Sequence, residues 1–495
     1  MDRPWRQWRS IAEGCASALE HIRAASIHLP LAGAGDAADL RDTLGAPPDL
    51  VVRHVSGTVV LYLATIIDHN RVEDAVIRPI LSAPAGTTPL SPGVTAELSM
   101  LRTFGDAVDA LLSGKVIILS GHVGGLAIPV PKWPQRDIQE PPAEFLARGP
   151  HVGFIETLDT NIALLRHVIR DPSLRWRRIS VGRRTDIPGA LVYMDGLVRP
   201  DLLAMVRRHL RRAAPSFALD SSMLGQWLAP RSNALFPTIG TTERPDRAAA
   251  AILSGRVVIL VTGSPTALLI PNVFFHMLHV PEDYYQTPVM AFANRAVRAL
   301  GLLVAAGASP LLVALTTVNH DLIPERMFVA IAQARRGVPL PIALEVLLLE
   351  GTIEVIREAG IRLPGSVGQS VAIIGAVIVG QAAIMSGLIS APAVVVVSLA
   401  FIASFVLPST DLVMLLRLLR FPLIVLATTF GLFGVTWGLL LAVIYLCSLD
   451  SFGVPYLAPI SPLRPRGWQD MLWRRPLPRL RRSFVASSSG RGTDP

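Results

Sequence analysis

The residues of this chain whose types could carry out chemistry are scattered rather than grouped. Cys15 and Cys447 lie at opposite ends, and four of the 11 histidines, namely His54, His122, His151 and His167, are scattered singly. Neither cysteine belongs to a CxxC pair or a cysteine–histidine cluster, so no disulfide framework or zinc site is indicated. An isolated histidine is most simply an ordinary surface or core residue. We therefore expect neither a metal site nor a cofactor.

Two glycine-rich turns, 120–125 and 262–265, are the candidates for phosphate binding. Neither matches GxGxxG or GxxxxGK[ST] before a helix, the patterns that place backbone amides around a phosphate. Ser264 in the second turn has no GxSxG context and no base at a suggestive spacing. Plain hairpin turns explain both segments, and we predict that the chain is not an enzyme.

The most regular spacing of titratable groups is acidic. Glu350, Glu354 and Glu358 recur every four residues in the segment 340–362, and Glu345 precedes them. This spacing places them along one side of a helix that carries leucines on another side. The segment is too acidic to cross lipid alone, so we expect 323–362 to be interfacial or re-entrant. The carboxylates form either a solvated, salt-bridged face, or an acidic pore mouth or coupling helix.

The next 48 residues, 363–410, contain no charged side chain. This is about twice the roughly 20 apolar residues that cross a bilayer. The first predicted span of this run, 369–389, has a stripe of small residues suited to helix packing: Ala372, Ala376, Gly380, Ala383 and Gly387. The opposite face holds the candidate pore-lining residues Ser370, Ile374, Val377 and Gln381. A glutamine at mid-span requires a polar partner or water, so interhelical hydrogen bonding and a pore both remain open.

Three further spans are predicted, at about 299–319, 391–408 and 421–449, within a transmembrane domain covering 291–460. The tail, 461–495, is basic, and in 462–482 seven arginines face one acidic residue. By the positive-inside rule this tail is cytosolic. No apolar stretch follows the basic N-terminus, so no signal peptide is indicated and the N-terminal region is expected to be cytosolic too. Four spans satisfy the even number of crossings that this topology requires.

The N-terminal region contains an internal repeat. Segments 58–81 and 189–210 each predict a strand, a turn and a helix, and segments 112–131 and 253–271 each predict a hairpin after Ser-Gly-Lys or Ser-Gly-Arg. We therefore predict two related α/β subdomains, 49–150 and 151–290, after an N-terminal helix and linker in 1–48. A helix in 153–170 is expected to link them. The fold class is an α+β cytosolic region followed by an all-α multi-span transmembrane domain.

The overall charge does not indicate a nucleic-acid ligand. The net charge is +9, and 44 of the 46 basic residues are arginine, Lys115 and Lys132 being the exceptions. The arginines are spread along the sequence with no basic stripe interleaved with aromatic residues. A bias in genome composition explains this usage more simply than nucleic-acid binding.

Strings that run through most of the chain resemble one family. They include GFIETLDTNIALLR (153–166), PEDYY (281–285), VPLPIALE (338–345), REAGIRLPGSVGQSVAIIGAVIVGQAA (357–383) and SFGVPYLAP (451–459). They resemble the A subunit of the spore germinant receptors, the GerA/GerK-type family that includes the SpoVA-operon paralogue. One departure is Thr262–Gly263, where the family usually has Asp-Gly.

The resemblance implies a multi-pass protein of the inner spore membrane. It implies a homo-oligomer that works with a permease-like B subunit and a lipoprotein C subunit, and that forms a nutrient-gated, ion-conducting complex. A non-conducting scaffold that couples the B subunit to a separate channel is the alternative. A secondary transporter is less consistent with the sequence, because the repeat lies outside the membrane segments.

Overall fold

The computed structural model describes residues 34–463 with gaps at 83–97, 121–123, 133–143, 145–148, 213–216, 232–233 and 363–379, together with residues 468, 470, 471 and 473. The chain divides into two compact units. Unit 1 comprises Met1–Ser232, Ile239–Pro271 and Arg481–Pro495, and unit 2 comprises Asn233–Thr238 and Asn272–Leu480. Each unit is described by itself.

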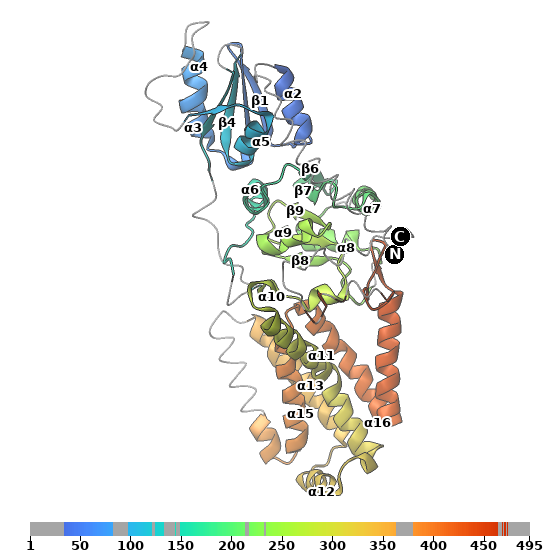
Figure 1. The fold of residues 1–495 in the computed structure, drawn as a ribbon. Helices are drawn as coiled ribbons and strands as arrows, with labels where there is room; N and C mark the ends of the chain where they lie inside the picture. The colour runs from blue at the N-terminus through green and yellow to red at the C-terminus, as the bar shows by residue number, and fades with distance from the viewer. Residues whose placement is uncertain are drawn as a thin grey trace. The chain divides into compact units, whose positions relative to one another are not determined.

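The first subdomain of unit 1 is an antiparallel sheet in the order β1-β2-β4-β5-β3 (Figure 1). Its strands are β1 (Leu50–Val55), β2 (Thr58–Leu63), β4 (Lys115–Ser120), β5 (Gly124–Pro129) and β3 (Ser99–Leu101). Strand residues alternate between two cores, as the two-residue period of a strand requires. Leu61 and Ile117 share a core with α2 (Ala34–Thr43) and α5 (Phe104–Leu112). Val60 and Val116 share the other with the helical segment α3 (His69–Val72), η2 (Glu73–Ile77) and α4 (Arg78–Ser82).

The second subdomain repeats this topology in the order β6-β7-β9-β10-β8. Its strands are β6 (Leu174–Val181), β7 (Ile187–Met194), β9 (Val257–Val261), β10 (Ala267–Ile270) and β8 (Gly240–Thr242). Helices α6 (Leu158–Val168) and α9 (Pro245–Leu253) pack in one core with the sheet. Helix α8 (Ser221–Leu228) contacts β10 and also α7 (Pro200–Arg212). The predicted pair of related α/β subdomains is thus confirmed, although the outer strands of each sheet were not predicted.

Two local expectations about unit 1 differ from the structure or lie outside it. Residues 34–43, expected to be part of a linker, form α2, whose Leu40 is fully buried in the first core. The helix expected near the N-terminus lies outside the described residues.

The turn at 262–265 is a plain hairpin turn, as predicted, with Gly263 at φ 83°. Ser264 is buried there, with its hydroxyl 2.8 Å from that of Ser221.

Helix α6 joins the two subdomains through a buried polar group. The Asp49 carboxylate accepts hydrogen bonds from the Arg166 guanidinium (2.9 Å), the Trp176 indole (3.0 Å) and the Thr65 hydroxyl (2.6 Å). Ala163 of the same helix packs in the first subdomain's core, and Leu165 packs in the second. The helix therefore links the subdomains, as expected, by contacting both cores.

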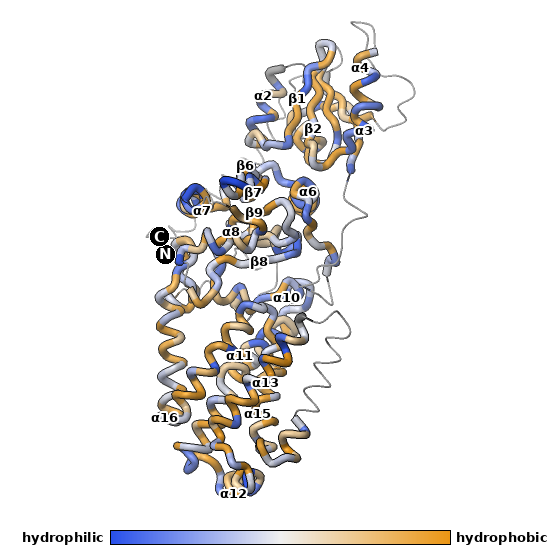
Figure 2. The backbone as a smooth tube through the Cα atoms, turned by 180° about the vertical axis from the view of Figure 1, so that it is seen from behind, coloured by the Kyte–Doolittle hydropathy of each residue, from blue (hydrophilic) through white to orange (hydrophobic). Residues whose placement is uncertain are grey.

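Unit 2 is helical. After α10 (Glu282–Tyr285) come α11 (Pro288–Thr317), α12 (Glu325–Ala334), α13 (Ile342–Arg362), α15 (Ala391–Phe405) and α16 (Thr410–Ser448). Helices α11, α13, α15 and α16 contact one another and lie side by side in Figure 1. Among the described residues, α11 and α16 are long and apolar enough to cross a membrane. In the most apolar 18-residue stretch of each helix, only 39% and 28% is buried, so most of its apolar side chains face outward. Figure 2 shows by colour that both helices are largely hydrophobic.

Helix α16 is two helical segments that reverse direction at Gly431. This glycine has φ 61° and ψ −141°, which is not a helical conformation. Beyond it, Gly438 lies directly against the Leu423 side chain, and Gly434 against the Leu426 carbonyl. In one continuous helix, residues 423 and 438 would be about 22 Å apart. The stretch 421–449, which was expected to be a single span, is therefore not one continuous helix, because the chain turns back inside it.

Both ends of this hairpin meet in one core. Leu412 near its start packs in the same cluster as Leu446 near its end. At the turn, the Asn319 side-chain oxygen accepts a hydrogen bond of 2.8 Å from the Leu432 amide, which the break in the helix leaves without its intrahelical acceptor. The two segments, 410–430 and 432–448, have lengths of about 31 and 26 Å at the helical rise.

Candidate functional site

The glutamates of α13 point into the helical unit rather than into solvent. Glu350 is 3% exposed, and the Arg420 guanidinium donates to its carboxylate at 2.9 Å. The Ser309 hydroxyl donates to the same carboxylate at 2.6 Å. These three residues come from α13, α16 and α11, so one buried charge pair connects three helices that are distant in the sequence.

Further polar contacts extend along α13 on either side of this pair. Toward its C-terminus, Glu354 accepts from Arg417 at 2.8 Å and from Arg357, one turn away, at 2.7 Å. Toward its N-terminus, Glu345 is fully buried and accepts from the Ser390 hydroxyl (2.8 Å) and the Ser390 amide (3.1 Å) just before α15. Together these contacts form what we call the glutamate ladder: Glu345, Glu350 and Glu354 with their partners Ser390, Ser309, Arg420 and Arg417.

Leu344, Leu348 and Val355 of α13 lie on the side that the ladder leaves outward. Leu344 and Leu348 are 43% and 48% exposed and Val355 is 70% exposed, while Glu345 and Glu350 are buried. A water-exposed amphipathic helix shows the opposite arrangement. The interpretation of a solvated acidic face is therefore wrong for Glu345 and Glu350. Glu358 is exposed and has a partner in the structure.

Most of the predicted pore segment lies outside the described residues. This applies to Ser370, Ile374 and Val377 of the candidate lining, and to Ala372 and Ala376 of the packing stripe. Gln381 is described and exposed, in a helical stretch at 380–385. Gly380 and Ala383 are partly buried in the same stretch. Gly387 follows the helix in a turn at φ 66°, so its assignment as a helix-packing position is wrong.

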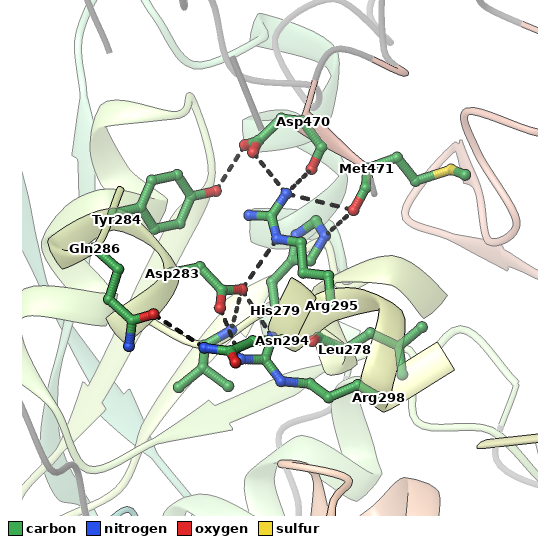
Figure 3. Close-up of polar contacts among 11 residues, drawn as sticks. Leu278, His279, Asp283, Tyr284, Gln286, Asn294, Arg295, Arg298, Asp470 and Met471 are labelled. Carbon is green, nitrogen blue, oxygen red and sulfur yellow. Dashed lines mark hydrogen bonds and ion pairs between the residues drawn. The ribbon is translucent and has the colours of Figure 1, made fainter. Parts of the chain in front are cut away.

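A second polar cluster lies where α11 begins (Figure 3). Asp283 of α10 is fully buried and accepts from Arg298 at 2.7 and 2.8 Å and from Arg295 at 3.0 Å. Arg295 also donates to the Asp470 side chain (3.0 Å) and main-chain carbonyl (2.7 Å). The Tyr284 hydroxyl donates to Asp470 at 2.6 Å. Two arginines thus balance two aspartates, and the cluster fastens residues near the C-terminal tail to α10 and α11.

The titratable groups of this cluster are shifted by burial and by one another. Burial alone would raise the pKa of Asp283, but its hydrogen bonds and charge interactions with Arg298 and Arg295 lower it below its usual value. Burial, with a smaller contribution from Arg295, lowers the pKa of His279 to about 4. The His279 Nε2 lies 2.9 Å from the Met471 carbonyl, which can only accept, so the neutral ring carries its proton there. Burial also raises the pKa of Tyr284, and Asp470 adds to this increase.

Sequence reasoning missed this cluster and the arginine partners in the ladder. The string PEDYY contains Asp283 and Tyr284, and that string was the available signal for the cluster. Arg417 and Arg420 lie between the predicted spans 391–408 and 421–449. Nothing in their spacing indicates that they meet Glu354 and Glu350, which lie 63 and 70 residues earlier.

The fold and the two charge clusters define a class of protein. In this class an α/β region is joined to apolar helices, and the charged side chains of the helical unit form buried ion pairs. A model of the family described as Bacillus/Clostridium GerA spore germination protein matches residues 38–484. The chain belongs to this family of spore germination proteins.

Relatives match over most of their length. Spore germination protein KA of Bacillus subtilis (strain 168) is 33% identical over 458 residues, covering 89% of this chain and 84% of the relative. Spore germination protein GerLA of Bacillus cereus is 33% identical over 452 residues, covering 88% and 92%. The uncharacterized membrane protein YfkQ of Bacillus subtilis (strain 168) is 34% identical over 444 residues, covering 88% and 86%.

One solved structure is also similar. It is the N-terminal domain of the A subunit of the Bacillus megaterium spore germinant receptor GerK3. The match has a TM-score of 0.38 and 21% identity, and it covers 50% of this chain and 97% of that one.

Proposed function

We propose that this chain is the membrane subunit of a spore germinant receptor and that copies of it assemble into a nutrient-gated, ion-conducting complex that triggers germination. The observation that carries the proposal is the family match across both units, residues 38–484. The outward apolar surfaces of α11 and α16 and the inward charges of α13 support a place in the bilayer. The proposed setting is the inner spore membrane, with the N-terminal region and the tail in the cytosol.

In this proposal α13 is embedded beside α11 and α16 rather than lying at the interface. Paired charges are the form in which carboxylates and guanidinium groups are tolerated within a membrane. Because the Glu350–Arg420 pair ties α13 to α16, and Ser309 ties both to α11, a displacement of one helix is transmitted to the other two. We therefore propose that the ladder is a coupling element among the helices of unit 2.

The conducting path is proposed to involve the segment 369–389 of several copies. Gln381 is exposed on the single chain, and a glutamine facing lipid is unfavourable, so it should face water or another copy. The partners proposed by family relationship are a permease-like B subunit, which senses the nutrient, and a lipoprotein C subunit.

Spores that carry Gln381→Leu or Val377→Glu test the lining. Cation release after addition of nutrient should change in rate or nutrient dependence while the protein level in the membrane stays the same. Met385→Leu is the matched control. Met385 is 87% exposed in the same helical stretch, and the substitution replaces one apolar side chain by another. Release identical to the parent in both test variants would show that the pore is lined elsewhere.

A non-conducting scaffold is the second candidate, and one observation favours it. Glu345 and Glu350 already have partners inside one chain, which leaves them unavailable as a free acidic ring at a pore mouth. Under this alternative the subunit couples the permease-like partner to a separate channel. Normal assembly with the partner but no cation flux through the purified complex is the result that distinguishes it.

A further inference from the structure

Arginines that are dispersed along the sequence gather at one end of the second subdomain. The segment 172–219 contains ten arginines against three aspartates. Seven of the arginines are exposed, and five of these lie in two groups: Arg183 and Arg184 in the turn between β6 and β7, and Arg208, Arg211 and Arg212 in the last turns of α7. Figure 2 shows α7 as one of the most hydrophilic elements of unit 1.

The described chain just beyond α7 lies beside the β6–β7 turn. The Ala218 amide, six residues after α7, donates to Thr185 in the turn at 3.4 Å. Gly182 of the turn also lies against the backbone of 217–218. Residues 217 and 218, which follow the end of α7 by five and six residues, therefore lie beside the turn that carries Arg183 and Arg184.

Apolar side chains are exposed beside these arginines. Phe217 is 53% exposed and Leu219 is 65% exposed, immediately next to the turn. Trp227 on α8, the helix that contacts α7, is 56% exposed. We call the five arginines together with Phe217, Leu219 and Trp227 the arginine–aromatic patch.

The charges of the patch are not neutralised within the described part of the chain. The ion pairs found in this segment are Arg175–Asp195 and Arg199–Asp201, and neither involves an arginine of the patch. The five patch arginines make no hydrogen bond or ion pair to another described residue. Five like charges beside exposed aromatic groups attract an anionic partner that also accepts apolar side chains.

We propose that the arginine–aromatic patch binds the headgroup region of an anionic lipid surface. Basic side chains interact with anionic headgroups, while tryptophan, phenylalanine and leucine insert at the boundary with the acyl chains. The apolar helices of unit 2 begin shortly after β10 ends at Ile270, so unit 1 is tethered near the bilayer. Tethering gives a high effective concentration, so even a weak lipid affinity leads to occupancy. The inference rests on the membrane location of unit 2 and is independent of ion conduction.

A fluorescence quenching experiment on the full chain tests this inference. Cys15 and Cys447 are replaced by serine, Leu219→Cys is labelled with a fluorophore, and the protein is reconstituted in nanodiscs that contain a lipid with a nitroxide at the headgroup. The nanodiscs consist of phosphatidylcholine alone or with added phosphatidylglycerol. We expect strong quenching only with phosphatidylglycerol, and its loss when salt rises from about 0.1 M to about 1 M, where the Debye length falls from about 10 Å to about 3 Å.

Matched variants separate the patch from general charge effects. Replacing Arg183, Arg184, Arg208, Arg211 and Arg212 by glutamine should abolish the dependence on phosphatidylglycerol. Replacing the exposed Arg53, Arg71 and Arg78 of the first subdomain by glutamine should preserve it. Equal quenching in both lipid compositions, or an unchanged response in the patch variant, would overturn the proposal and leave an acidic protein or a nucleic acid as the patch's ligand.

Discussion

Arg420 and Glu350, 70 residues apart in the sequence, form a buried ion pair with a separation of 2.9 Å between α16 and α13. Glu350 is 3% exposed and Arg420 is 1% exposed, and Ser309 of α11 donates to the same carboxylate. Breaking such a pair leaves an uncompensated buried charge, whereas replacing both partners removes the problem.

Glu350→Gln is therefore expected to destabilise the protein by about 3–5 kcal/mol. The double variant Glu350→Leu/Arg420→Leu should be less destabilised than the single variants Glu350→Leu and Arg420→Leu. Thermal unfolding of each purified variant in detergent, monitored by size-exclusion chromatography, measures these losses of stability. Arg53→Gln, which removes an exposed pair with Glu73, is the control and should cost under about 1 kcal/mol. If the double variant were as unstable as the sum of the two single variants, the pair would not be the cause.

Asp49→Asn should loosen the joint between the subdomains. The Arg166 side chain, 4% exposed, would lose its counterion, although the hydrogen bonds from Trp176 and Thr65 could remain. We expect faster hydrogen exchange in α6, corresponding to a loss of about 3 kcal/mol or more of local stability. Asp195→Asn is the matched control, since Asp195 is 60% exposed in its pair with Arg175. Equal exchange in parent and variant would exclude a joining role for Asp49.

Acidification should release residues 470–471 from α10 and α11. The pKa of His279 is lowered to about 4, against about 6.5 in an unfolded chain. The folded state binds the proton more weakly, so stability is complete above about pH 6.5 and is lost as the pH falls toward 4. The two pKa values imply that the free energy of unfolding falls by about 2 kcal/mol by about pH 5. Asp283, whose pKa is also lowered, adds a loss in the same direction at still lower pH.

Hydrogen exchange or limited proteolysis near residues 470–471, followed against pH, measures this release. His279→Gln retains a donor for the Met471 carbonyl and does not titrate, so it should flatten the response between about pH 6.5 and about pH 5. His54→Gln, at an exposed position, should leave the response unchanged. An identical pH response in parent and His279→Gln would rule out the histidine as its source.

The reversal at Gly431 predicts a specific membrane topology. Single cysteines at Ser409 and Ser448, in a background without Cys15 and Cys447, should react with an impermeant maleimide from the same side of the membrane. A cysteine at Thr429 should react only from the other side. Labelling of Ser409 and Ser448 from opposite sides would mean that 410–448 crosses once, against the structure.

Gly431 itself should resist substitution. A side chain there would meet the Asn319 side chain and adopt a positive φ, so Gly431→Ala should destabilise the hairpin by at least about 1 kcal/mol. Gly307→Ala is the matched control in α11, because nothing lies within 4 Å of the position of its added Cβ. Equal thermal stability of the two variants would contradict a conformational requirement at Gly431.

Local patterns predicted the repeated subdomains because each strand and helix carries its own signal. The VIIL and VVIL runs after Lys115 and Arg256 became β4 and β9 in matching positions of two sheets. The short outer strands β3 and β8 have three residues each, which is too few for the two-residue alternation of a strand to be recognised in the sequence. The hairpin at Gly431 was missed because hydropathy continues unbroken through the turn.

The ladder could not be predicted for a different reason. The spacing of Glu350 and Glu354 defines a helix face but not the side on which protein or lipid lies. Arg417 and Arg420 supply that information only through tertiary contacts. The resemblance in residues 153–459 nevertheless led to the family, which the match over 38–484 confirms.

The claim that this subunit forms part of an ion-conducting complex is tested most directly by flux. The purified chain, alone and with its permease-like and lipoprotein partners, would be reconstituted in potassium-loaded liposomes and exposed to candidate nutrients. We predict potassium release that depends on nutrient and is altered by Gln381→Leu but not by Met385→Leu. Assembly of the complex with no potassium release under any of these conditions would contradict it.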